Sequence, residues 1–106
     1  MADSMAIFAP NINSFRRMVP GCYAPLTANW GYENRTTAVR IPGGDHRAMR
    51  IEHRVAGADT NSYLTVAAIL AGALYGIENK LQAPRAVVGD AGDLKPTLPH
   101  FWNDAI

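Results

Sequence analysis

The sequence lacks most features of secreted, nucleic-acid-binding and membrane proteins. Its single cysteine, Cys22, cannot form a disulfide within the chain, which is consistent with a reducing compartment. The formal net charge of +1 gives no surface that would attract nucleic acid. Residues 1–8 have neither the basic start nor the long apolar core of a signal peptide. The most apolar stretch, residues 64–77, is shorter than a membrane span of about 20 residues. We therefore expect a cytoplasmic protein with neither nucleic acid nor a membrane as partner.

The length of 106 residues allows one small domain, and no internal repeat or low-complexity tract divides it. The β-branched residues 36–41 and the alternating residues 49–55 predict two strands, which residues 43–45 connect by a turn. A further short strand is expected at residues 26–30. These strands predict an antiparallel sheet.

A long helix is expected after the sheet. Asp59, Thr60 and Asn61 offer short polar side chains that accept hydrogen bonds from the free amides of a first helical turn, so we expect the helix to run from there to about Leu81. Residues 64–77 are almost entirely apolar, which predicts a helix buried on most of its circumference. The fold class is therefore α+β, an antiparallel sheet backed by a long buried helix. From Pro99 onward we expect a last helix.

Arginine is concentrated around the predicted hairpin, where no lysine occurs. The five arginines between residues 34 and 54 are Arg35, Arg40, Arg47, Arg50 and Arg54. Because strand side chains alternate, Arg50, Glu52 and Arg54 should lie on one face, with Ile51 and His53 on the other. One interpretation is a solvated ladder of charges worth roughly 0.2–1 kcal/mol. The other is a phosphate site, since guanidinium groups grip phosphate oxygens in bidentate fashion.

Two other patterns do not predict a site. His46 lies in a turn and His53 should point away from Glu52, so their spacing does not indicate a transition-metal centre. Gly43 and Gly44 lack the Lys-Thr or Lys-Ser continuation and the strand-to-helix context of a phosphate-binding loop.

Four segments, in this order, resemble the carboxy-terminal catalytic region of the glutamine synthetase family. They are residues 11–21 (NINSFRRMVPG), 34–42 (NRTTAVRIP), 50–54 (RIEHR) and 59–64 (DTNSYL). Family members are several times longer, so the resemblance implies an internal fragment of the catalytic domain, spanning residues 1–106, without the amino-terminal domain. It also implies a parent enzyme that is a ring-shaped homo-oligomer with active sites shared between neighbouring subunits.

The resemblance implies an ATP-dependent ligase in which the γ-carboxylate of glutamate is phosphorylated and then attacked by ammonia or an amine. Arg17 would hold the α-carboxylate of the amino-acid substrate; the alternative is an exposed loop arginine. Arg35 would contact the phosphoryl group in transfer, and Arg54 would hold substrate carboxylate and phosphate oxygens. Arg35 and Arg54 are therefore the candidate catalytic residues.

ATP and Mg2+ (or Mn2+) are the cofactors that the resemblance implies. Arg35 and Arg40, with help from Arg47 or Arg50, would contact the phosphates of ATP. Arg35 and Arg40 are five residues apart, so in a regular strand they would face opposite sides. Both reach one site only if Arg35 lies on a turn or a bulge intervenes. Glu52 would ligate the metal ion, and the remaining ligands of the family would lie outside the chain.

One departure from the family concerns the nucleophile. Ammonia-using glutamine synthetases carry a glutamate two residues after the Pro-Gly pair that ends the first motif, where this chain has Tyr23, preceded by Cys22. Neither side chain is ordinarily negative at neutral pH. We therefore expect a primary amine, such as the polyamine putrescine, as substrate, with Tyr23 lining its pocket or packing into the flap. The acidic residues that a distal ammonium needs would have to come from outside the chain.

Two alternatives stay open. Another carboxylate, such as Glu33, can stand in for the missing glutamate, which would make the parent an ordinary ammonia-using glutamine synthetase. As an isolated chain, the segment can also be a non-catalytic structural or interaction piece.

Overall fold

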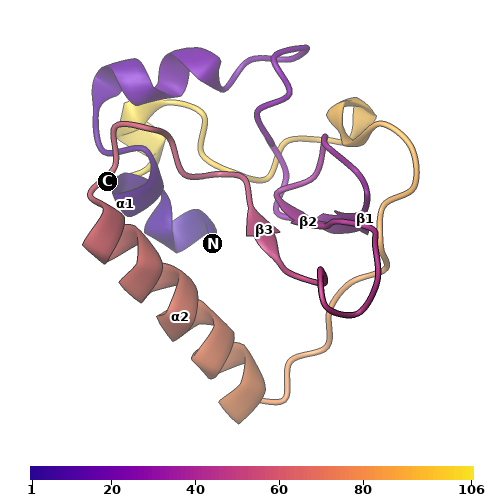
Figure 1. The fold of residues 1–106 in the computed structure, drawn as a ribbon. Helices are drawn as coiled ribbons and strands as arrows, with labels where there is room; N and C mark the ends of the chain where they lie inside the picture. Colours follow the sequence, from indigo (N-terminus) through magenta and orange to yellow (C-terminus); the bar gives the residue numbers. More distant parts are fainter.

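The computed structural model describes all of residues 1–106, and Figure 1 shows its small sheet, the long helix α2 beside it and a carboxy-terminal segment that returns toward α1. The strands and α-helices are β1 (Trp30–Tyr32), β2 (Val39–Ile41), β3 (Glu52–His53), α1 (Met5–Phe8) and α2 (Ser62–Glu78). Turns of 3-10 helix lie at Ala2–Ser4, Ile12–Arg17, Ala91–Asp93 and Trp102–Asp104. The α+β class predicted from the sequence is confirmed.

The sheet is mixed, with strand order β1-β2-β3, whereas the sequence predicted only antiparallel pairs. β2 and β3 pair antiparallel, as expected, but the chain reverses in the longer 42–51 loop, whose turn lies at residues 46–48 and not at the predicted 43–45. β1 and β2 run parallel, with Trp30 beside Val39. The parallel pair arises because Glu33 has a φ of +51° and residues 34–37 form a turn, which brings the chain back to the start of β1. The predicted strand at residues 26–30 is accordingly displaced to β1.

The strands are shorter than the sequence predicted. Thr36 and Thr37 direct their hydroxyl groups to Asn34 instead of joining a strand, so β2 begins at Val39. β3 pairs only with Val39 and Arg40, and the residues before it lie outside the sheet.

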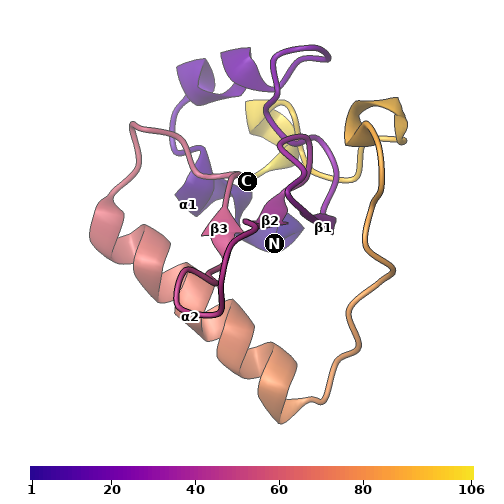
Figure 2. The ribbon, with the colours of Figure 1, turned by 45° about the vertical axis from the view of Figure 1, so that its right-hand side comes forward.

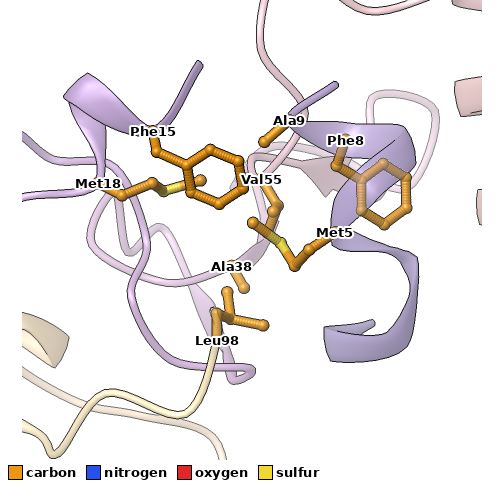
Figure 3. Packing of buried hydrophobic residues seen from close by; sticks show 8 residues of the cluster. All are labelled: Met5, Phe8, Ala9, Phe15, Met18, Ala38, Val55 and Leu98. Carbon is orange, nitrogen blue, oxygen red and sulfur yellow. The ribbon is translucent and has the colours of Figure 1, made fainter. Parts of the chain in front are cut away.

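The core lies between α1, the 3-10 turn of residues 12–17 and the loops that flank β2 and β3 (Figure 3). Its eight buried side chains are Met5, Phe8, Ala9, Phe15, Met18, Ala38, Val55 and Leu98. Aromatic contacts extend it at both ends, with Phe15 edge-on to Trp102 and the ring of His53 at 4.5 Å from that of Phe8. His53 therefore serves packing, and Ala38 and Val55 anchor the two chain segments that carry the arginines.

Helix α2 begins as predicted, because the side chain of Asn61 accepts hydrogen bonds from the amides of Tyr63 and Leu64. The prediction that this helix is buried is wrong for this chain, since none of its residues is buried. Only a narrow strip, including Ala68 and Ile69, packs against the core, and Leu70 is 63% exposed. No other segment of the chain covers the remaining apolar faces of α2. No helix in the structure has the length and hydropathy needed to cross a membrane.

After α2 the chain returns past β1 in an extended conformation (Figure 2). Trp30 fixes this return: its Nε1 donates to the Pro84 carbonyl at 2.7 Å, and its own carbonyl accepts from the Val87 amide at 2.9 Å. Further on, the Leu98 amide donates to the Leu26 carbonyl at 3.0 Å. These contacts hold residues 90–93 beside the segment that contains Tyr23. The last helix predicted from Pro99 is only the 3-10 turn of Trp102–Asp104.

Candidate functional site

Arg40 occupies the centre of the candidate site, between two carboxylates. Its Nη1 lies 3.1 Å from Glu52 Oε2 and its Nη2 lies 3.1 Å from Glu33 Oε1. The Arg40 side chain is only 15% exposed, because β1 and β3 flank the strand that carries it. Glu33 also accepts a hydrogen bond from the Gly43 amide, and this bond, together with the charges of Arg40 and Arg35, lowers the pKa of Glu33. The Glu33 carboxylate is thus held in the ionised form.

Arg54 links the sheet to the loop that contains Tyr23. Its Nη1 donates to the Thr37 carbonyl at 3.0 Å, and its Nη2 donates to the Tyr23 carbonyl at 3.3 Å. Burial lowers the pKa of the Arg54 guanidinium, and the nearby positive charges of Arg40 and Arg35 lower it further, against the opposing charge of Glu52. A guanidinium in a field of like charge is a ready partner for an anion.

Arg35 lies on the turn before β2, which is the condition under which the sequence allowed Arg35 and Arg40 to share one site. Its charge, like that of Arg40, lowers the pKa of both Glu33 and Arg54, so Arg35, Arg40 and Arg54 lie within electrostatic range of one another. We call these three residues the arginine cluster.

Arg47 and Arg50 are exposed and lie on the 42–51 loop that joins β2 to β3. The Arg47 amide donates to Asp45 within that loop, and Arg50 Nη1 donates to the Ala48 carbonyl at 3.2 Å. Neither side chain forms an ion pair, and the carboxylate of Glu52 is paired with Arg40 across the sheet instead of with Arg50. The solvated ladder of Arg50, Glu52 and Arg54 is therefore not formed.

Arg17 reaches the cluster from the 3-10 turn of residues 12–17. Its Nη2 donates to the Val55 carbonyl, and burial lowers its pKa while the charge of Asp59 opposes that shift. Asp59 in turn accepts hydrogen bonds from Ser14 Oγ at 2.5 Å and Asn11 Nδ2 at 3.2 Å, which lower the pKa of its carboxyl. Arg17 is thus half-buried and held in place, not a freely exposed loop arginine. The sequence signalled Asp59 only as part of a helix start.

Tyr23 stands at the rim of a cavity of about 250 Å³. The residue has a φ of +55° and its side chain is 69% exposed, so it projects from the loop instead of packing into it. The residues that line the cavity are Val19, Pro20, Gly21, Tyr23, Ala24, Leu26, Thr36, Asp90, Ala91, Gly92 and Asp93. The lining therefore combines apolar residues of the 19–26 segment with Asp90 and Asp93 of the 90–93 segment, which we call the acidic wall.

The acidic wall is attached to the turn that carries Arg35. Asn34 Nδ2 donates to the carbonyls of Val87 and Gly89 at 3.2 and 2.8 Å, and the Ala91 amide donates to Thr36 Oγ1 at 2.8 Å. Sequence reasoning recognised Asn34 and Thr36 only as parts of a motif, because their partners lie more than fifty residues away. The sequence pattern also did not single out Asp90 and Asp93.

Glu52 is the one residue of this chain that the sequence predicted as a metal ligand. The chain contains no group of three or more His, Cys, Asp or Glu side chains that can hold a metal ion. Mg2+ takes six oxygen ligands in octahedral geometry, so Glu52 fits as one ligand, and substrate phosphates, water and residues outside the chain would supply the others.

Known proteins are similar to this chain over most of its length. Residues 1–106 match the family described as glutamine synthetase, catalytic domain. The chain is 54% identical over 90 residues to the γ-glutamylputrescine synthetase PuuA of Escherichia coli (strain K12), which covers 85% of this chain and 19% of that protein. It is 44% identical over 96 residues to a glutamate–isopropylamine ligase of Pseudomonas sp, covering 91% and 21%. It is 45% identical over 85 residues to the γ-glutamylethanolamide synthetase GlnA4 of Streptomyces coelicolor (strain ATCC BAA-471 / A3(2) / M145), covering 80% and 18%. The chain thus spans about a fifth of the length of these relatives.

Proposed function

The chain belongs to the glutamine synthetase catalytic-domain family, and we propose that it works as one segment of a longer ATP-dependent ligase that joins the γ-carboxylate of glutamate to an amine. We call that longer protein the parent enzyme, and we propose that it is a ring-shaped homo-oligomer. The observation that carries the proposal is the arginine cluster beside the loop of Tyr23, since Arg54 bonds to the Tyr23 carbonyl. The arginines that we propose to bind phosphate therefore lie next to Tyr23, where we propose that the nucleophile binds.

In this proposal the chain supplies positive charge to the transferring phosphoryl group. Arg35 and Arg54 would contact the phosphoryl and carboxylate oxygens, where fixed cations stabilise the charge of the transition state. Arg40, and Arg47 or Arg50 from the neighbouring loop, would contact the phosphates of ATP. When bound, ATP would supply the phosphoryl group and Mg2+ or Mn2+ would screen its charge.

Two further residues have roles in binding. Glu52, oriented by Arg40 at 3.1 Å, would contribute one metal ligand. Arg17 would hold the α-carboxylate of glutamate; its guanidinium is fixed by the Val55 carbonyl and lies near Arg54. A fixed cation holds a carboxylate at a smaller entropic cost than a mobile one.

The proposed nucleophile is a primary amine such as putrescine. Tyr23 gives no carboxylate at the position where ammonia-using members of the family have glutamate. Glu33, the alternative carboxylate, accepts from Arg40 and from the Gly43 amide through its Oε1, so its charge is already offset by a cation within the chain. Of the three relatives described above, two are named for the products γ-glutamylputrescine and γ-glutamylethanolamide and one for isopropylamine, which supports the same choice.

Competition between ammonium and putrescine in a phosphate-release assay of the parent enzyme tests the proposal. We expect putrescine to be used with the higher kcat/KM, and Tyr23→Glu to shift the preference toward ammonium. Tyr23→Phe is the matched control, because it alters the same residue without introducing a carboxylate and should leave the preference unchanged. A preference of the unaltered enzyme for ammonium by about tenfold, which equals about 1.4 kcal/mol of transition-state binding, would identify an ordinary glutamine synthetase instead.

A further inference from the structure

We propose that the cavity behind Tyr23 receives the far end of a diamine substrate and that Asp90 and Asp93 accept its distal ammonium group. This inference rests on the proposed amine-ligase function. It replaces the expectation that the acidic residues for a polyamine lie outside the chain, because both aspartates line the cavity.

The chemistry of the cavity matches a short alkyl diamine. Part of the lining is apolar, with Pro20, Tyr23 and Leu26, and suits a chain of methylene groups. The acidic wall carries Asp90 and Asp93, whose carboxylates suit an ammonium ion. The volume of about 250 Å³ holds a small ligand but not a large one.

Both carboxylates retain capacity for a cation. Asp90 uses Oδ1 to accept the Gly92 amide at 2.8 Å, and its other oxygen accepts no hydrogen bond within the chain. Neither aspartate forms an ion pair, since Arg40 makes both ion pairs of the structure. The acidic wall therefore has no internal cation that a bound ammonium would have to displace.

The acidic wall is also fixed relative to the arginine cluster. Asn34 and Thr36, which flank Arg35, bind the backbone of residues 87–91 through three hydrogen bonds of 2.8 to 3.2 Å. On the other side, Arg54 holds the Tyr23 carbonyl at 3.3 Å. A diamine with its reacting nitrogen near Tyr23 and Arg54 thus extends across the cavity toward the aspartates.

The test compares two amines in the parent enzyme: putrescine, and n-butylamine, which has the same alkyl chain without the distal nitrogen. The double variant Asp90→Asn/Asp93→Asn keeps side-chain volume, and the amide oxygen that it places at position 90 can still accept from the Gly92 amide. We expect KM for putrescine to rise about tenfold, KM for n-butylamine to stay within about twofold, and kcat to change little. Asp104→Asn, an exposed aspartate that does not line the cavity, is the matched control and should leave both amines unaffected.

The outcomes separate the two proposals. If the unaltered enzyme uses putrescine but the double variant has the same KM for it, or loses both amines equally, the cavity does not bind the distal ammonium while the amine-ligase function stands. If the unaltered enzyme uses only ammonium, both are overturned. Equal melting temperatures of the double variant and the control show that the segment remains folded.

Discussion

Arg40 and Glu52 are paired directly across β2 and β3, with Nη1 at 3.1 Å from Oε2. The same guanidinium also holds Glu33, which lies at the end of β1, so a single cation joins residues from all three strand regions. This arrangement divides the arginines by role. Arg40 has its charge offset by two carboxylates, whereas Arg35 and Arg54 form no ion pair and keep their charge available for an anionic substrate.

Replacing Arg54 or Arg35 by Lys in the parent enzyme should lower kcat/KM by about a hundred- to a thousandfold, or roughly 3 to 4 kcal/mol, despite the conserved charge. Lysine is a point donor and cannot reproduce the fork with which Arg54 donates to the Thr37 and Tyr23 carbonyls and, in the proposed function, to an anion. Steady-state kinetics with ATP, glutamate and amine measure the effect. Arg85→Lys, an exposed arginine outside the site, is the control; near-normal rates in both variants would mean that these are ordinary surface arginines.

Much of this site could be predicted from the sequence because it is encoded locally. The motif around Arg35 and Arg40 and the helix cap at Asn61 depend on residues a few positions apart. Two other features depend on the return of the chain after α2, for which no local pattern exists. They are the partners of Asn34 and Thr36 and the cavity that both Tyr23 and Asp90 line. The burial of α2 was predicted from its apolar composition. An apolar composition indicates that a helix needs a packing partner, but it does not show where that partner lies. Beyond the strip that packs against the core, no segment of this chain covers α2, and Leu70 therefore stays exposed.

Gly31 marks the close approach of β1 to the returning segment. A Cβ at this position would lie 2.8 Å from the Val87 carbonyl oxygen and 3.1 Å from Asn34 Cβ. Gly31→Ala should therefore destabilise the fold by about 1–3 kcal/mol, as expected for overpacking against backbone. Gly72→Ala in α2 has nothing within 4 Å and should stabilise by about 0.5–1 kcal/mol through helix propensity. Denaturant unfolding measures the free energy of unfolding of each variant. If the two variants were equally stable, residues 87–91 would not be held against β1.

A low pH should protonate Asp59 and so remove the negative charge that helps to hold Arg17 in place. Hydrogen bonds from Ser14 and Asn11, with the charge of Arg17, lower the pKa of Asp59 in the folded state. A lowered carboxyl pKa contributes stability above the unfolded pKa, and the contribution is lost as the pH falls through the folded pKa. The melting temperature of the parent enzyme should thus exceed that of Asp59→Asn at about pH 7, with the difference shrinking below about pH 4. Asp104→Asn controls for general charge effects, and a difference independent of pH would contradict the assignment.

The isolated chain should bind nucleotide without turning it over. It carries the arginine cluster, but Glu52 is its single candidate metal ligand and no cluster of acidic or histidine side chains supplements it. One carboxylate cannot hold the Mg2+ ions that phosphoryl transfer needs. We expect no ADP formation with ATP, glutamate and putrescine, yet a rise in melting temperature with millimolar ATP and Mg2+, because a ligand that binds only the folded state stabilises it. The rise should disappear in Arg35→Ala and persist in Arg85→Ala. Turnover comparable to that of a whole ligase would contradict the first expectation, and a melting temperature insensitive to nucleotide would favour a structural or interaction role for the chain on its own.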